Sequence, residues 1–211
     1  MIGRWVNTKK KSNAPWLVVG LGNPEGKYFQ TYHNMGFLVA DEMATRLGLD
    51  FTKKGNFLTT DFLTAKGEKC IIIKPLTYMN RSGEAVLHHV RKYKIPHERI
   101  IVLVDDLHID RSKIKIAVGG GHNGHNGIRN ISALLGSPPE SQGNYAKVKL
   151  GIKPEKPPEV IANYVLMRFR EDEKPLITEG IKLGADATLA IVNGETIQNI
   201  QTKYNVKQNT K

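Results

Sequence analysis

Short apolar runs alternate with longer amphipathic stretches along the chain, and this pattern predicts strands alternating with helices. Continuous apolar runs at Trp16–Leu21 and Ile100–Val104 are typical of strands buried on both faces. The segments Phe57–Ala65 and Lys69–Lys74 predict a strand pair joined by a glycine-containing turn. The pattern therefore predicts an α/β protein with a mixed sheet.

Apolar residues recur at helical spacing in three stretches, each followed by a residue that ends helices. These ending residues are Gly48, Pro96 and Gly136. Two more helical segments are expected at Glu159–Leu166 and Glu171–Val192, after a proline-rich linker. Helices spaced between the strands in this way favour a three-layer arrangement with the sheet in the middle.

The length of 211 residues suits one domain with a full hydrophobic core. We therefore expect a single three-layer αβα domain around a mixed, mainly parallel sheet, at residues 15–200. The basic segment 1–14 is expected to be a disordered arm. An organelle transit peptide is the alternative, because this segment contains no acidic residue. Residues 201–211 are expected to form a polar tail that frays.

The formal net charge of +11 is a large excess for this length and favours a polyanionic partner such as nucleic acid. Solubility alone is the competing explanation. No apolar run approaches the ~20 residues that a membrane-spanning helix requires. The single cysteine, Cys70, excludes an internal disulfide and a cysteine-rich metal site, and it favours a reducing compartment such as the cytoplasm.

Five glycines fall within the ten positions Val118–Gly127, together with two histidines and two asparagines. Glycine weakens helices and strands, so such a run is used where the backbone turns sharply or approaches a ligand closely. An apolar helical pattern resumes at Ile128. The stretch is therefore expected to be a loop leading into a helix, whose free backbone N–H groups favour anionic ligands.

Two strands with alternating lysines and apolar residues flank this glycine stretch, at Lys113–Val118 and Tyr145–Gly151. Each strand is expected to have one solvent-exposed, basic face. This face either is simply solvated or binds phosphate. Four lysines lie on these faces: Lys113, Lys115, Lys147 and Lys149.

Polar side chains follow four of the expected strands, where ligands bind in open α/β sheets. They are Asn23, Asn80, Asp105 and the glycine stretch, and His33 lies just beyond the first of these loops. A histidine paired with an aspartate is a common general base, and amides stabilise an oxyanion without carrying charge. This set of side chains favours hydrolysis by an activated water over covalent catalysis.

Several other functional classes lack their motifs. The glycines of Gly20–Gly26 are one residue too widely spaced for a dinucleotide fingerprint, and neither a P-loop nor a serine-hydrolase elbow is present. His122 and His125 are metal-ligating types, but no clear third ligand accompanies them, so no metal site is expected.

A purely structural role is the alternative for each candidate residue. Taken alone, His33 is better explained as a hydrogen-bonded histidine at a helix start. An aspartate at a strand end often caps a turn, and this explanation fits Asp106, whereas Asp105 is the functional candidate. For Asn23 and Asn80 a capping role and a functional role are about equally favoured by the residues alone.

Five segments of the chain together resemble bacterial-type peptidyl-tRNA hydrolases, in the same order and with the same spacing. The segments are Val18–Pro24, Tyr32–Gly36, Lys74–Gly83, Val104–Asp106 and Gly119–Gly127. The likeness extends from about residue 16 to about residue 169. Any one segment would be weak evidence, whereas their joint occurrence is specific.

The resemblance implies an α/β enzyme that cleaves the ester between a peptide and the 3′ end of tRNA, with no metal and no cofactor. It implies that His33 is the general base, that Asp105 orients it and that Asn23 helps to recognise the peptide end. It further implies a cytoplasmic monomer that binds peptidyl-tRNA. Substrate or tRNA contacts are expected at Tyr28, Asn34, Tyr78, Met79, Asn80, His125, Asn126, Lys113, Lys115 and Lys149.

The chain departs from the family pattern in three places, none of them in the expected catalytic set. The segment Asp106–Arg111 lacks the usual proline, Ala117 stands at one position of an expected basic pair, and Lys149 stands where arginine is often found. Lysine cannot bind a phosphate bidentately as arginine does. Two other functions remain open: an RNA-related scaffold, as in a plant relative of the family, and a general nucleic-acid binder that acts through charge alone.

Overall fold

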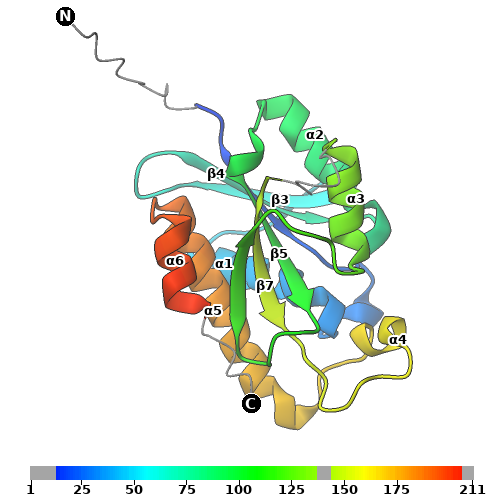
Figure 1. Cartoon of the computed structure of the whole chain (residues 1–211). Coiled ribbons are helices and arrows are strands. Elements are labelled where there is room, and N and C mark those ends of the chain that lie inside the picture. Colours follow the sequence, from blue (N-terminus) through cyan, green and yellow to red (C-terminus); the bar gives the residue numbers. More distant parts are fainter. Residues whose placement is uncertain (1–12, 137–143, 206–211) are drawn as a thin grey trace, which may run out of the picture.

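The computed structural model describes residues 13–136 and 144–205, which form a seven-stranded sheet between two layers of helices (Figure 1). The strand order is β2-β3-β4-β1-β5-β7-β6. The four central strands β4, β1, β5 and β7 are parallel, while β3 and β6 run antiparallel to their neighbours. The strands are β1 (Trp16–Gly20), β2 (Thr52–Lys54), β3 (Phe57–Leu63), β4 (Lys69–Pro75), β5 (Ile100–Asp106), β6 (Ile114–Val118) and β7 (Ala146–Gly151).

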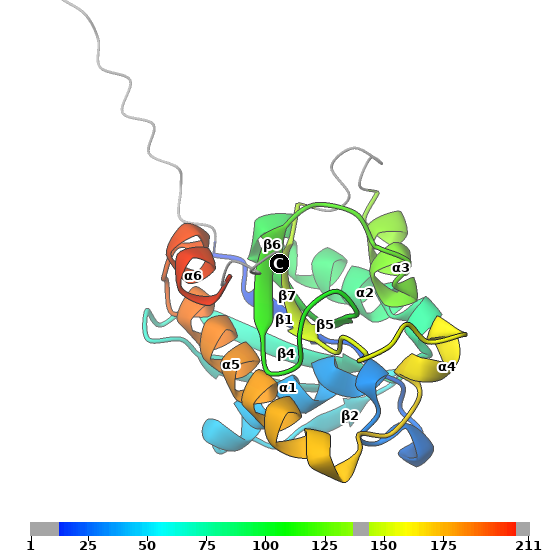
Figure 2. The ribbon, with the colours of Figure 1, turned by 60° about the horizontal axis from the view of Figure 1, so that its bottom comes forward.

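Helices cover both faces of the sheet, which confirms the expected three-layer α/β fold (Figures 1 and 2). One face carries α1 (Met35–Arg46), α5 (Lys174–Val192) and α6 (Ile197–Tyr204). The other face carries α2 (Gly83–Tyr93) and α3 (Asn126–Leu134). A short helix, α4 (Ile161–Val165), lies on the side where β5 and β7 end. Among the described residues, no helix is long and apolar enough to cross a membrane.

The continuous apolar runs of β1 and β5 are explained by burial on both faces of the sheet. Val18 packs in the core on the α1 and α5 side, whereas Leu17 and Val19 pack on the α2 and α3 side. Leu103 and Val104 of β5 divide between the same two cores. Each such side chain, fully buried, contributes about 1.5–3 kcal/mol, so these two strands are the centre of the stable structure.

The antiparallel pairing of β3 with β4 confirms the expected strand pair, and positive φ angles at Gly48 and Gly136 confirm the expected helix ends. The pattern missed the short, exposed strand β2. It also placed the start of a fraying tail at Gln201, which is wrong because this residue lies inside α6. Burial of Ile200 holds that helix against the domain. Residues 1–12 of the expected arm and residues 206–211 of the expected tail lie outside the described residues.

The expectation that the lysine-bearing face of β7 is exposed to solvent is wrong. Lys147 is only 1% exposed, and Lys149 is largely covered. The physical reason is the position of the strand: β7 lies between β5 and β6, and the glycine stretch folds over its lysine-bearing face. Lys115 on the edge strand β6 is exposed, as expected.

The start of α1 is packed directly onto the sheet at Gly36. A β-carbon at this position would lie 2.3 Å from the carbonyl oxygen of Leu103 and 2.4 Å from the amide nitrogen of Leu21. Only glycine permits this approach of helix to strand. The approach brings the 3-10 turn Tyr32–Asn34, which immediately precedes α1, next to the end of β5.

Substituting Gly36→Ala is expected to lower the free energy of unfolding by about 1–3 kcal/mol, because the added methyl group meets backbone atoms that cannot move aside. This cost exceeds the gain of up to about 1 kcal/mol that alanine brings to a helix. Urea unfolding measures the difference. The control is Gly26→Ala, where a β-carbon would meet nothing within 4 Å and φ is not positive. Equal stability of the two variants would contradict the account.

Candidate active site

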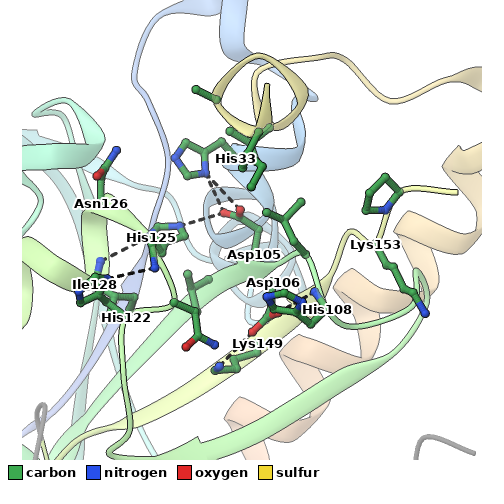
Figure 3. Close-up of a pocket in the computed structure, with 18 of the residues that line it drawn as sticks. His33, Asp105, Asp106, His108, His122, His125, Asn126, Ile128, Lys149 and Lys153 are labelled. Carbon is green, nitrogen blue, oxygen red and sulfur yellow. Dashed lines mark hydrogen bonds and ion pairs between the residues drawn. The ribbon is translucent and has the colours of Figure 1, made fainter. Parts of the chain in front are cut away.

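Three side chains from distant parts of the chain meet at the end of β5 (Figure 3). Asp105 is the penultimate residue of β5, His33 lies in the turn before α1, and His125 immediately precedes α3. The sequence pattern predicted that Asp105 follows its strand, but it lies within the strand. The regular strand geometry at this position holds the carboxylate in one place between the two rings.

His33 and Asp105 form the histidine–aspartate pair that the residue types suggested. The Nδ1 atom of His33 lies 3.1 Å and 3.2 Å from the two carboxylate oxygens of Asp105. Since an ionised carboxylate only accepts hydrogen bonds, Nδ1 must carry the proton and donate it. In the neutral ring the other nitrogen, Nε2, then keeps its lone pair.

His125 makes a second hydrogen bond to the same carboxylate, and sequence reasoning missed it. Its Nδ1 accepts the backbone N–H groups of Gly127 at 3.1 Å and Ile128 at 3.4 Å, so His125 is the N-cap of α3. The proton of the neutral ring therefore lies on Nε2, which donates to Asp105 at 3.2 Å. The only sequence signal was the position of His125 at the expected helix start.

The contacts at this site shift the pKa values of Asp105 and His33. Burial would raise the pKa of the Asp105 carboxyl, but the positive ends of His33 and His125 outweigh it and hold that pKa well below its usual range. For His33, burial alone would lower the pKa, but the Asp105 carboxylate acts more strongly and the net result is a raised pKa. Asp105 is thus a permanent anion beside a histidine that it helps to protonate.

Asn23 and Asn34 tie the neighbouring loops together. The backbone N–H of Asn23 donates to Oδ1 of Asn34 at 2.8 Å, and Nδ2 of Asn34 donates back to the carbonyl of Asn23 at 3.0 Å. Oδ1 of Asn23 accepts the backbone N–H of Met79 at 3.0 Å. Nδ2 of Asn23 has no acceptor among the residues that the structure describes, so it is free to donate to a ligand.

The triad opens into a cavity of about 730 Å³. Of the side chains expected at the site, His33, Asp105, His125, Asn126 and Lys149 line this cavity. The others lie outside its lining: Asn23, Tyr28, Asn34, Tyr78, Met79, Asn80, Lys113 and Lys115. Tyr78 is 55% exposed and donates to Glu25, whereas Met79 is buried against α3. Substrate contacts at these outer positions stay predictions.

Two of the three lysines expected to bind tRNA phosphates form ion pairs with carboxylates. Lys149 lies 2.9 Å from Asp106 (Figure 3), and Lys113 lies 3.0 Å from Asp110. Lys115 has no ion-pair partner among the described residues. Phosphate binding by the first two would therefore require the exchange of an existing partner.

His33, Asp105 and His125 also have the donor types of a metal site, with ligand atoms within 4.8 Å of one another. The set joins His125 to His33 and Asp105 and does not contain His122, the other histidine of the candidate pair in the sequence. The same atoms are already used in hydrogen bonds, and a metal would have to displace the protons on Nδ1 of His33 and Nε2 of His125. The hydrogen-bonded arrangement accounts for all three side chains by itself.

Comparison with known proteins places these features in one family. The family model for peptidyl-tRNA hydrolase matches residues 17–211. Peptidyl-tRNA hydrolase of Thermoanaerobacter sp. is 41% identical over 199 residues, which cover 90% of this chain and 99% of that protein. The Clostridium acetobutylicum enzyme is 40% identical over 191 residues, covering 90% of this chain and 97% of that protein.

Solved structures agree with this. The crystal structure of peptidyl-tRNA hydrolase from Acinetobacter baumannii superposes with a TM-score of 0.80 at 29% identity, covering 92% of this chain and 96% of that one. The chain therefore belongs to the peptidyl-tRNA hydrolase family.

Proposed function

We propose that this peptidyl-tRNA hydrolase cleaves the ester between a peptide and the tRNA 3′ end by direct attack of water, with His33 as the general base. One observation carries the proposal: Asp105 accepts N–H groups from both His33 and His125. This arrangement fixes the tautomer of His33 and leaves Nε2 unprotonated in a ring that lines the cavity.

In the proposed reaction, a water oxygen forms a bond to the ester carbonyl carbon while Nε2 of His33 takes a proton from that water. The imidazolium that results is stabilised by the Asp105 carboxylate. The tetrahedral intermediate then breaks its bond to the ribose oxygen, which receives the proton from His33 and leaves as a hydroxyl group. The products are a free peptide carboxylate and deacylated tRNA.

Water is the proposed nucleophile because the side chains around the cavity offer no alternative of the usual kind. The described lining residues include no serine, threonine or cysteine. The steps above also need no Lewis acid, so we propose a metal-independent reaction. Proton transfer to a positioned histidine contributes about a hundredfold to ten-thousandfold to such a rate.

Asn126 is the proposed donor to the oxyanion of the intermediate. It is the first residue of α3, its side chain is exposed at the cavity, and the amide has no hydrogen-bond partner among the described residues. An uncommitted amide at a helix N-terminus can donate to developing negative charge. The free Nδ2 of Asn23 supports a similar role toward the peptide end of the substrate.

We further propose that the enzyme acts as a monomer in the cytoplasm. The proposed base His33, its partner Asp105 and the proposed oxyanion donor Asn126 come from one chain and line one cavity. The only cysteine, Cys70, is buried and free, which is consistent with a reducing compartment.

Substituting His33→Ala is expected to lower turnover of N-acetyl-aminoacyl-tRNA by at least about a hundredfold, because no other side chain is placed to take the proton. Binding of deacylated tRNA should be unchanged. His97→Ala is the matched control, since His97 is half-buried in a turn before β5 and does not line the cavity. Wild-type turnover by the His33 variant would exclude it as the base and would leave an RNA-binding scaffold as the better explanation.

Substituting Asp105→Asn is expected to change both the rate and its pH dependence. The protonated ring of His33 cannot accept a proton, so kcat/KM of the wild type falls as the pH drops through the raised pKa of His33. Removing the carboxylate lowers that pKa, so the midpoint of the acid limb should move to lower pH. The plateau should fall about a thousandfold or more, because the amide favours the wrong tautomer. Asp61→Asn, at an exposed ion pair with Lys69 outside the cavity lining, should change neither. An unshifted midpoint would contradict the pairing.

A further inference from the structure

The cavity contains a second unusual polar group, Lys147, on the part of its wall formed by β7. Its side chain is buried, and its Nζ donates to the carbonyl oxygens of Gly120 at 2.6 Å and Gly121 at 3.5 Å. No carboxylate pairs with Lys147 within the described part of the chain. Its neighbour Lys149, by contrast, is neutralised by Asp106. The fold therefore buries an ammonium group without a counter-ion at the cavity wall.

An unpaired ammonium in this position is unfavourable in the free protein. Burial, together with repulsion from Lys149, lowers the pKa of Lys147 to about 8. An anion that entered the cavity would relieve this penalty, because opposite charges attract more strongly where water is excluded. The charge of Lys147 therefore favours an anionic ligand in the cavity over a neutral ligand or no ligand.

Three backbone N–H groups of the glycine stretch complete the environment. Gly121, His122 and Asn123 line the cavity, and their N–H groups have no acceptor among the residues that the structure describes. In a planar trans peptide the C=O and N–H point in opposite directions. Because the carbonyls of residues 120 and 121 point toward Lys147, the N–H groups of residues 121 and 122 point away from it.

A left-handed turn follows the three free N–H groups, and the N–H groups of Gly124 and His125 within and after this turn bond to His122. Asn123 and Gly124 have φ angles of 46° and 79°, in the left-handed region. Consecutive free N–H groups next to left-handed residues form concave sites that bind phosphates and similar anions. The segment continues directly into His125 and Asn126, which lie at the proposed reaction centre.

We propose that the N–H groups of Gly121, His122 and Asn123 form a subsite for a phosphate group of the nucleic-acid substrate, the phosphate next to the esterified 3′ nucleotide. Lys147 lies on the other side of the loop backbone, where it orients these N–H groups through the carbonyls and adds its positive charge. The inference rests on the proposed function, which brings the 3′ ester to His33 in the same cavity. This phosphodiester is the backbone anion nearest to the ester in every tRNA. Lys147 thus has two tasks: it orients the glycine stretch and supplies the charge.

A titration followed by ¹H–¹⁵N NMR tests the subsite independently of catalysis, with adenosine 5′-monophosphate as the probe. The amide resonances of residues 121–123 should shift with the nucleotide and stay in place with adenosine, which lacks the phosphate. Substituting Lys147→Gln keeps one N–H donor for the loop carbonyls but removes the charge. The variant should bind the nucleotide about tenfold or more weakly.

Lys53→Gln is the matched control, because it removes the same charge from an exposed position on the edge strand β2 and should change the affinity by less than about twofold. Equal shifts with adenosine and with the nucleotide would overturn the proposal. So would equal affinities of the wild type and the Lys147→Gln variant. If the glutamine side chain displaces the loop, the amide resonances of the free variant will differ from those of the wild type. In that case the comparison of adenosine 5′-monophosphate with adenosine on the wild-type protein still tests whether the subsite binds phosphate.

Kinetics separate failure of the subsite from failure of the proposed function. Lys147→Gln should raise KM for N-acetyl-aminoacyl-tRNA by about tenfold or more while leaving KM for N-acetyl-aminoacyl-adenosine, an ester without phosphate, within about twofold. The same rise for both substrates, or for neither, would contradict a phosphate contact. A wild-type enzyme that hydrolyses neither ester would contradict the proposed function, and the NMR titration would still test the subsite.

Discussion

The structure of the site depends on one buried carboxylate that accepts hydrogen bonds from two histidines. Asp105 is only 6% exposed, and an ionised carboxylate at such a position costs several kcal/mol unless it is hydrogen-bonded. His33 and His125 provide those bonds, and both contact the Oδ1 atom of the carboxylate (Figure 3). Each ring is thereby held in one orientation and one tautomer. A single charge thus couples the turn before α1, the end of β5 and the start of α3.

The rest of the fold brings these three segments together. Two-sided burial makes β5 a rigid support for Asp105, and the glycine contact at Gly36 lets α1 approach that strand closely enough to place His33. The glycine stretch ends at His125, which caps α3 with one ring nitrogen and reaches Asp105 with the other. Lys147 holds the same stretch from the opposite side. Each of these interactions stabilises the fold only modestly, and together they fix the positions of His33, Asp105 and His125 relative to one another.

The layers of the fold could be predicted from the apolar runs, which carry that information directly. The pairing of His33 with Asp105 was implied by the family resemblance, because the residues alone favoured a structural role for His33. The bond from His125 to Asp105 could not be predicted, since it depends on how the start of α3 lies over the end of β5. Lys147 was expected to be exposed because alternation shows which residues share a face and does not show what covers that face. Both failures concern contacts between segments far apart in the sequence.

The tautomers of the two histidines test the central claim most directly. Long-range ¹H–¹⁵N NMR of the imidazole rings, recorded above the pKa of His33, distinguishes a proton on Nδ1 from a proton on Nε2. The account predicts opposite tautomers: Nδ1–H for His33, with Nε2 free as the base, and Nε2–H for His125, with Nδ1 capping α3. A proton on Nε2 of His33 under these conditions would contradict the account, because the nitrogen that should accept the proton from water would already carry one.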